Sequence, residues 1–256
     1  MPQNPAQRQR HRARAAVTIA IVVAFLTGCV TGPSGPGPAR QQAGVVEGHV
    51  TDSQGRPISG AEVFADNTLF YDANLLATTD ENGYYEIRLD ADVPGTWRIG
   101  GSVTAPVGDG HYRFSLHPVS DETFLGEDGA IRDLEWRLSG RPTPGDSRYY
   151  GALVYVYDVS QSEEFLEPES VELTFTPDGP LIDGSDGSPI TTSINGYQVE
   201  DVPVGDYRVT ARYLGSPARD LVLRMRFDEA FQRELPAHFS LDPYGQLILE
   251  LEFALA

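Results

Sequence analysis

The side chains that usually carry catalysis or bind metals are few in this sequence. Behind its first 28 residues the histidines are His49, His111, His117 and His238, and no two stand at the i, i+4 spacing of a helical zinc pair. His111 and His117 are expected in one loop-and-strand region, so a zinc pair there is an alternative to ordinary surface histidines. No serine lies in a G-x-S-x-G elbow. These patterns favour neither zinc chemistry nor acyl transfer from a serine.

A Gly-rich stretch, residues 178–187, places three carboxylates close together in the chain: Asp178, Asp183 and Asp186. Carboxylate oxygens are the ligands that Ca²⁺ prefers, but the spacing does not match an EF-hand loop and no bidentate Glu follows. Calcium binding is therefore one interpretation and an ordinary long loop between strands is the other. Because loops tolerate insertions, Asp183 and Asp186 are also candidates for contact with a partner.

Aromatic side chains form the second candidate surface. Phe70 and Tyr71 lie in an expected loop, and Tyr149 and Tyr150 lie beside an expected linker. Exposed rings of this kind could stack on sugar rings, although most aromatic residues of a β-sandwich belong to its core.

The charge of the chain restricts its partners. It carries 37 Asp and Glu against 19 basic residues, all of them Arg. If the first 28 residues and their four arginines are removed, 15 basic residues remain against 37 acidic ones, a formal charge of −22. Such a surface repels phosphate backbones, so no nucleic-acid partner is expected.

The N-terminal segment has the order of a secretory signal peptide. Arginines at the start are followed by the apolar run AAVTIAIVVAFL at residues 15–26, which is too short to span a bilayer. The run ends in LTGC, where Cys29 is the sole cysteine. This order resembles the lipobox of bacterial lipoproteins, which implies cleavage after residue 28 and acylation of Cys29 with palmitate-type chains.

Several acyl chains on one residue would give a stable membrane anchor. Residue 30 is Val rather than the Asp that marks inner-membrane retention in many lipoproteins, so the outer membrane, on its periplasmic or surface side, is the favoured location. Residues 29–43 are then the lipidated Cys and a Gly/Pro-rich tether of at most ~50 Å.

Beyond the tether, the pattern predicts an all-β protein. Val45 to Thr51 alternates in polarity, and Gly and Pro punctuate strand-like runs every 8–12 residues, which is typical of a β-sandwich. The turn Asp80-Glu81-Asn82-Gly83 is expected to close a hairpin.

The phrases VEGHVTDSQGRPISGAEV, TTDENGYYEI and VPGTWRI resemble a carboxypeptidase regulatory-like domain. That resemblance implies a transthyretin-like (prealbumin-like) Greek-key sandwich over residues 44–140, related to carbohydrate-binding-like folds, with a non-catalytic role and no cofactor. Hydrolases of this fold that act in purine breakdown end in Tyr-Arg-Gly-Ser, whereas this sequence ends FALA. Dioxygenases with a related sandwich bind iron through two Tyr and two His, and no such cluster can be assigned.

A second, divergent sandwich is predicted over residues 148–256, because TTDENGY at 78–84 returns as TTSINGY at 191–197. In this interpretation residues 225–227 correspond to the strand at 112–114, and residues 249–253 to those at 134–138. The strand from Leu153 to Tyr157 has bulky side chains on both faces and is expected to be largely buried. Residues 228–234 are the one expected helical turn.

Together these patterns predict two tandem β-sandwiches on a lipid anchor. We expect a non-catalytic module of the cell envelope that contacts the membrane through Cys29 and binds an envelope protein. A carbohydrate-binding module that uses exposed aromatics is the alternative, and an unrecognised hydrolase is the third hypothesis.

Overall fold

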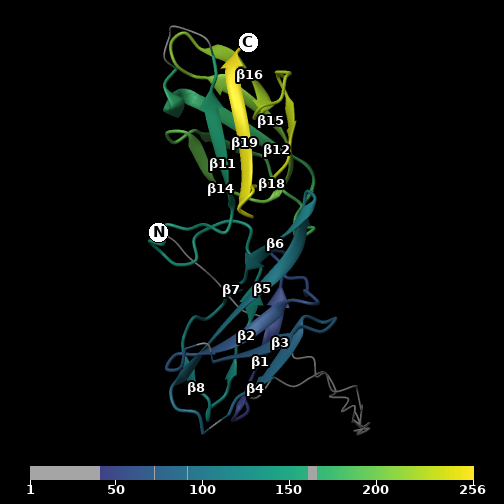
Figure 1. Ribbon diagram of the computed structural model, residues 1–256, viewed down its shortest axis with the longest axis vertical. Coiled ribbons are helices and arrows are strands. Elements are labelled where there is room, and N and C mark those ends of the chain that lie inside the picture. The colour runs from purple at the N-terminus through teal and green to yellow at the C-terminus, as the bar shows by residue number, and fades with distance from the viewer. Residues whose placement is uncertain (1–40, 72, 91, 161–165) are drawn as a thin grey trace, which may run out of the picture. The chain divides into compact units, whose positions relative to one another are not determined.

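The computed structural model describes residues 41–71, 73–90, 92–160 and 166–256. Its regular structure is almost entirely β-strand, with one short 3-10 helix, η1 (Pro168–Ser170). The predicted all-β class is confirmed (Figure 1).

Residues 45–135, the N-terminal half, form two five-stranded sheets. The first contains β4 (Tyr84–Arg88), β1 (Val45–Thr51), β10 (Leu134–Glu135) and β7 (His117–Pro118) in that order, with β9 (Ala130–Ile131) also paired to β1. The second contains β3 (Asn74–Thr78), β2 (Glu62–Asn67), β5 (Thr96–Val107) and β6 (Gly110–Ser115), with β8 (Phe124–Leu125) paired to β5.

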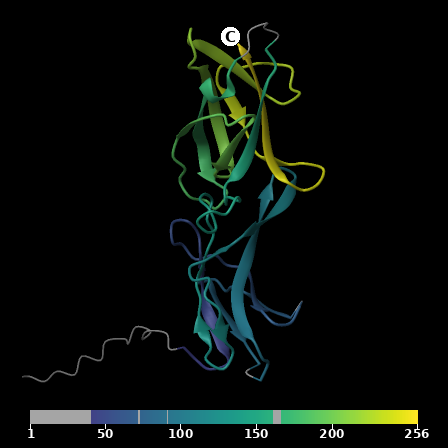
Figure 2. The same cartoon turned by 90° about the vertical axis from the view of Figure 1, so that its left-hand side faces the viewer.

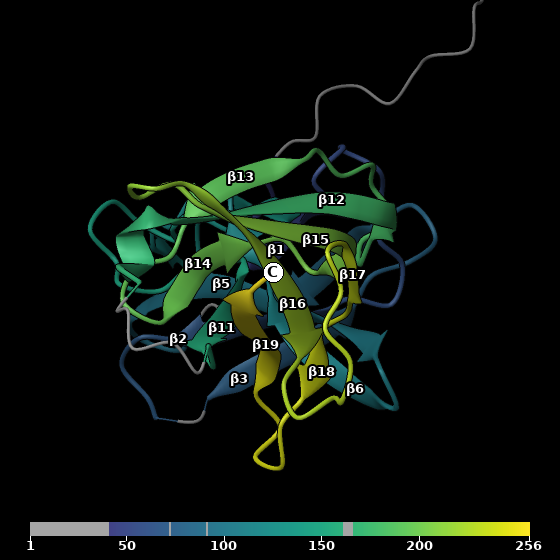
Figure 3. The ribbon, with the colours of Figure 1, turned by 90° about the horizontal axis from the view of Figure 1, so that it is seen from above.

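Residues 152–255, the C-terminal half, contribute a nine-stranded sheet. Its main path is β13 (Ile190–Ser193), β12 (Val171–Leu181), β15 (Gly205–Tyr213), β16 (Arg219–Met225), β19 (Leu247–Leu255), β11 (Ala152–Asp158) and β14 (Gln198–Val202). β17 (Leu235–Ala237) pairs with β15 and β18 (Ser240–Leu241) with β19. Because β15 and β16 pair through two register positions at their ends, the sheet can fold there into two layers (Figure 3).

The two halves share one pattern of strand pairing, which supports the predicted repeat. β1 pairs antiparallel with β4 and parallel with β10, and β11 pairs antiparallel with β14 and parallel with β19. β5 lies beside β2 and β6, just as β15 lies beside β12 and β16. The purple-to-blue strands of the N-terminal half and the green-to-yellow strands of the C-terminal half form two separate groups (Figure 2).

Alternating side chains build the core of each half, as the period of two requires for strands. In β1, Val46 and Val50 are fully buried and His49 between them is exposed. In β12, Leu173 and Phe175 are fully buried in the same way. Each inward-facing set meets the set from the opposing layer, so the core lies between the sheets.

The predicted hairpin at residues 80–83 is wrong. β3 and β4, which flank this turn, belong to different sheets, so the turn carries the chain from one layer to the other. The Asp80 carboxylate accepts hydrogen bonds from the backbone N–H groups of Asn82 (2.8 Å) and Tyr84 (2.9 Å). Gly83 has a φ of +73° and lies against the Val50 carbonyl, where a Cβ atom would have no room.

Three further expectations are corrected. Residues 225–227 do not match the strand at 112–114, because β16 ends at Met225 and the next two residues form a turn. Residues 228–234 are not helical; Gln232 exchanges two backbone hydrogen bonds with Leu223, both 2.7 Å long. β11 is not buried on both faces, since Val154 and Val156 face the core while Tyr155 and Tyr157 are half-exposed.

Candidate functional site

Phe70 and Tyr71 lie in the loop after β2, and both are exposed, Tyr71 completely. The loop is shaped by the buried Asn67, whose side-chain oxygen accepts hydrogen bonds from the backbone N–H groups of Leu69 (2.9 Å) and Phe70 (3.2 Å). Its amide group donates to the Pro94 carbonyl (3.3 Å). A buried polar side chain with all these partners holds the loop in one conformation and presents the apolar tip outward.

Beside this tip lies an open hollow of about 620 Å³. Arg98 and Asp66 form an ion pair of 3.4 Å on its wall. The ring of Phe64 covers Gly100, where a Cβ atom would lie 2.4 Å from the ring. The hollow therefore combines an aromatic surface with charged and polar groups from β2, β3 and β5.

Tyr149 and Tyr150, beside the predicted linker, are half-exposed. The Arg141 guanidinium lies 4.0 Å from the centre of the Tyr149 ring and donates a hydrogen bond to its hydroxyl. The Tyr150 hydroxyl lies 2.7 Å from Nδ1 of His117. Both rings thus pack against neighbouring side chains, and they hold the segment between the two halves in place.

We predict that His117 makes the protein lose stability in mild acid. Burial, followed by the charge of Arg137, lowers the pKa of His117 from its usual 6.5. Below pH 6.5 the unfolded chain therefore binds more protons at this residue than the folded protein does. The contribution of neutral His117 to the free energy of unfolding is complete above pH 6.5 and is lost as the pH falls toward the folded pKa. The free energy of unfolding, measured in urea from pH 8 to 5.5, should fall less steeply in His117→Asn. An equal slope of the free energy of unfolding against pH in His117→Asn and wild type would contradict this prediction. The matched control is His111→Asn, because His111 is exposed.

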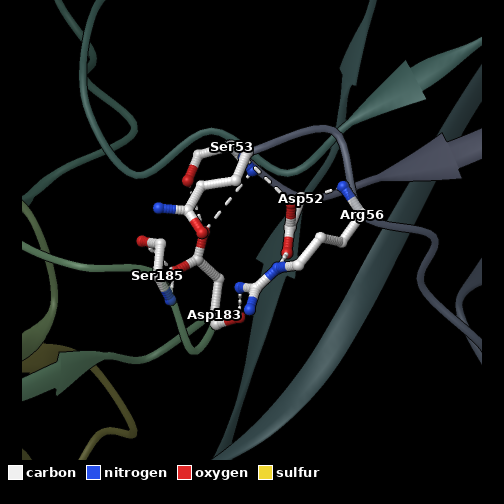
Figure 4. A network of polar contacts seen from close by, with 6 residues as sticks. Asp52, Ser53, Arg56, Asp183 and Ser185 are labelled. Carbon is white, nitrogen blue, oxygen red and sulfur yellow. Dashed lines mark hydrogen bonds and ion pairs between the residues drawn. The ribbon is translucent and has the colours of Figure 1, made fainter.

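Asp183 contributes to a polar network with the turn after β1 (Figure 4). Its carboxylate accepts hydrogen bonds from the hydroxyls of Ser53 (2.6 Å) and Ser185 (2.5 Å). Arg56 donates to the Asp183 carbonyl (3.0 Å) and pairs at 2.5 Å with the buried Asp52. This network joins the N-terminal half to the loop of residues 182–189.

Burial alone would raise the pKa of Asp183, but the hydrogen bonds from Ser185 and Ser53 outweigh it and lower the pKa. The carboxylate is therefore ionised and already engaged by donors. Asp178 pairs with Arg208 (3.3 Å), and Asp186 is exposed. The three acids of the predicted calcium loop thus have separate surroundings, and no group of three or more His, Cys, Asp or Glu among the described residues could hold a metal ion.

A surface that the sequence analysis missed lies on the outer side of β11. Tyr155 is nearly parallel to Tyr197, with ring centres 6.0 Å apart and planes 10° apart. Tyr157 continues the row, 6.5 Å from Tyr155. Tyr197, the last residue of the TTSINGY stretch, is 58% exposed.

Arginines from the end of β16 complete this surface. The Arg226 guanidinium lies 4.1 Å from the Tyr157 ring centre and 4.7 Å from that of Phe227. It also forms an ion pair with Glu250, which raises the pKa of Arg226, while the Tyr157 hydroxyl lies 3.3 Å from the same carboxylate. Burial is the main cause that raises the pKa of Tyr157, so this hydroxyl stays protonated and donates to Glu250.

We call these residues the tyrosine–arginine face: Tyr155, Tyr157, Tyr197, Arg224, Arg226 and Phe227. Arg224 pairs at 2.7 Å with Glu252, which is only 6% exposed, and lies 4.5 Å from the Phe231 ring centre. Phe227 is 79% exposed and has a φ of +70°. Such a φ is strained for a bulky side chain, and the rest of the structure must hold it in place.

No helix of the described residues has the length and apolar character needed to cross a membrane. Cys29, the predicted lipidation site, and the predicted signal peptide lie outside the described residues.

Comparison with known proteins yields weak structural likenesses only. No family model and no curated protein matches this chain. The Bacillus anthracis TIE protein is 13% identical with a TM-score of 0.33 over 83% of this chain, which spans about a third (34%) of that protein. A single B repeat unit of the collagen-binding surface protein of Staphylococcus aureus is 12% identical (TM-score 0.21; 83% of this chain, 98% of that one). The major pilin of Streptococcus pyogenes is 8% identical (TM-score 0.26; 84% and 99%). Similarity this low assigns no function.

Proposed function

We propose that this protein is a non-catalytic, lipid-anchored module of the cell envelope that binds another envelope protein through its tyrosine–arginine face. The observation that carries the proposal is the row of three half-exposed or exposed tyrosines that ends in Arg226 and Phe227. Tyr, Phe and Arg are enriched in protein interfaces, and Tyr and Arg also among the residues that dominate binding energy.

The face is ordered before any partner arrives. Arg226 is held by two rings and by Glu250, and the tyrosine rings pack on one another. Side chains that are already fixed lose little conformational entropy on binding, which favours affinity. Polar groups at the same surface, among them the Glu250 carboxylate, supply directional hydrogen bonds.

The anchor and the domain boundaries rest on the sequence. The charged start, the short apolar run and LTGC support a signal peptide at residues 1–28 and acylation at Cys29, with a tether to residue 43. Val30 supports the outer membrane. Domains at residues 44–140 and 148–256 are supported by strand pairing, which occurs within each half. A non-catalytic role is supported by the structural partners of Asp183 and His117.

Photo-crosslinking in cells would test this function. A photoreactive residue in place of Tyr197 in the full chain should crosslink to a single envelope protein. The affinity for that protein, measured with both purified, should fall at least ~10-fold in Phe227→Asn, because the substitution removes a large, 79% exposed ring from the face. Asn tolerates a positive φ, so this substitution removes the ring without straining the backbone.

The matched control carries the crosslinker at Tyr244, which is 88% exposed in the loop between β18 and β19. Equal crosslinking from both positions, or an unchanged affinity in Phe227→Asn, would contradict the proposal.

A glycan is the second candidate ligand of the same face. The near-parallel rings of Tyr155 and Tyr197 favour it, because the apolar faces of sugar rings pack on aligned aromatic rings. A glycan array probed with the full chain separates the two functions. Glycans retained by wild type and released by Phe227→Asn, without a crosslinked protein in cells, would establish the carbohydrate function instead.

A further inference from the structure

The exposed loop that follows β2 lies at the end of the N-terminal half where the chain enters it. Gly44, just before β1, donates a backbone hydrogen bond to Gly126 (3.0 Å). The preceding residue, Leu125, pairs with Thr96 across β8 and β5. The Thr96 carbonyl in turn accepts a hydrogen bond from the backbone N–H of Thr68 (2.9 Å), which starts the loop. A short chain of backbone contacts thus joins the point of entry to the loop tip.

This end carries four exposed apolar side chains, which we call the tether-side apolar patch: Leu69 (64% exposed), Phe70 (46%), Tyr71 (102%) and Leu125 (43%). Three of them are consecutive in one loop. The buried Asn67 fixes that loop, and Gly95, with a φ of +103°, lets the neighbouring turn approach Leu69. The patch is therefore a fixed projection whose apolar groups face solvent in the isolated chain.

The length of chain before Gly44 brings a bilayer within reach of this patch, on the basis of the lipid anchor proposed above. About 14 residues separate Cys29 from Gly44, and they extend at most ~50 Å. A short tether gives the patch an effective concentration at the membrane in the millimolar range, so a weak affinity is sufficient for contact.

We propose that the tether-side apolar patch inserts into the interface of the bilayer that holds the anchor. Tyr71 and the neighbouring Leu and Phe suit this region, because aromatic rings with a polar end favour the boundary between headgroups and acyl chains. The contact would give the protein a second attachment and a defined orientation. The opposite end of the N-terminal half would then face away from the membrane.

The charges around the patch determine which lipid headgroups it can approach. Four exposed acidic residues lie in the loops at the same end: Asp90, Asp92, Glu127 and Asp128. Of the patch's near neighbours, Asp66 is already paired with Arg98. None of the four forms an ion pair with a residue that the structure describes, and such acidic groups repel anionic headgroups. The patch should therefore insert into a zwitterionic surface and be displaced from an anionic one.

Depth-dependent fluorescence quenching tests this inference. The Tyr71→Trp variant of the full chain is exported and acylated in a bacterial host and then placed in phosphatidylcholine nanodiscs. Its own tryptophans, Trp97 and Trp136, are 3% and 5% exposed and give a constant background. Bromine-labelled phosphatidylcholine should quench the added emission at least ~2-fold, and Tyr244→Trp, in the C-terminal half, should be unaffected. At least half of the quenching should be lost when Leu69→Ser/Phe70→Ser is added to the Tyr71→Trp chain. The same loss is expected when the disc contains phosphatidylglycerol.

Failure of this inference is distinguishable from failure of the anchor. If the chain enters nanodiscs no better than Cys29→Ala does, both the anchor and the inference are overturned. A chain that enters through Cys29 but leaves Trp at position 71 unquenched would overturn membrane insertion alone. Crosslinking of position 71 to a protein or a glycan in cells, with no quenching in discs, would assign the patch to that partner and also overturn the inference.

Discussion

Replacement of Gly48 by Ala should lower the free energy of unfolding by about 3 kcal/mol. Gly48 lies in the middle of β1, opposite Tyr85 of β4. A Cβ atom there would lie 2.0 Å from the backbone carbonyl oxygen of Arg132, so the added methyl meets main chain and not a movable side chain. The Arg132 carbonyl is fixed in turn, because it accepts a hydrogen bond from the Tyr85 hydroxyl. Urea unfolding, followed by tryptophan fluorescence, measures the loss.

Gly55→Ala is the matched control. Gly55 has a φ of +78° and nothing within 4 Å of its Cβ position, so the same substitution there costs only the strain of a left-handed backbone, about 1 kcal/mol. An equal loss of the free energy of unfolding in the two variants would show that the Arg132 carbonyl can move away from an added methyl group on Gly48.

The second large effect is expected at the ion pair between Arg224 and Glu252. These residues stand opposite each other on β16 and β19, and the Glu252 side chain is 8% exposed. Arg224→Met removes the cation and leaves a carboxylate with little access to water. A broken buried pair is strongly destabilising, so the free energy of unfolding should fall by about 3 kcal/mol or more. Urea unfolding of the variant at neutral pH provides the measurement.

The double variant Arg224→Met/Glu252→Leu identifies the cause of that loss. If the unpaired carboxylate is responsible, removal of both charges should restore most of the stability, since an apolar pair of similar volume is often as stable as a buried ion pair. Arg212→Met, which breaks the exposed pair with Asp220, should change stability by no more than about 1 kcal/mol. No recovery in the double variant would indicate that Arg224 acts through its packing on Phe231 instead.

The all-β architecture and the repeat could be predicted from the sequence because both depend on local periodicity. Alternation in Val45 to Thr51 marks a strand with one buried face, and the recurrence of TT-x-x-NGY marks equivalent positions in two copies. Which strand the chain pairs with next is not a local property. The turn at Asp80 has the composition of a hairpin, and only the pairing of β3 and β4 with different sheets shows that it is a crossover.

The candidate site was harder to predict, because it depends on segments far apart in the chain. Tyr155 and Tyr197 meet through the pairing of β11 with β14, and Arg226 reaches Tyr157 across β19. One local signal was present: Val154 and Val156 alternate with Tyr155 and Tyr157, and a hydroxyl at every second position indicates a face with access to water. By bulk alone, the tyrosines indicate a strand that is buried on both faces, and only their polarity distinguishes the exposed face.

The parallel pairing of the first and last strands in each half has a mechanical consequence. When a chain enters along one strand and leaves along its parallel neighbour, a pull on its two ends slides the strands past each other and loads all their hydrogen bonds at once. β11 and β19 share six register pairs, whereas β1 meets β10 through only two and β9 through two more. With the anchor and the partner proposed above, tension would enter the N-terminal half through β1 and leave it after β10, so this half should yield first and act as an extensible segment. The half that carries the tyrosine–arginine face would stay folded and keep its hold.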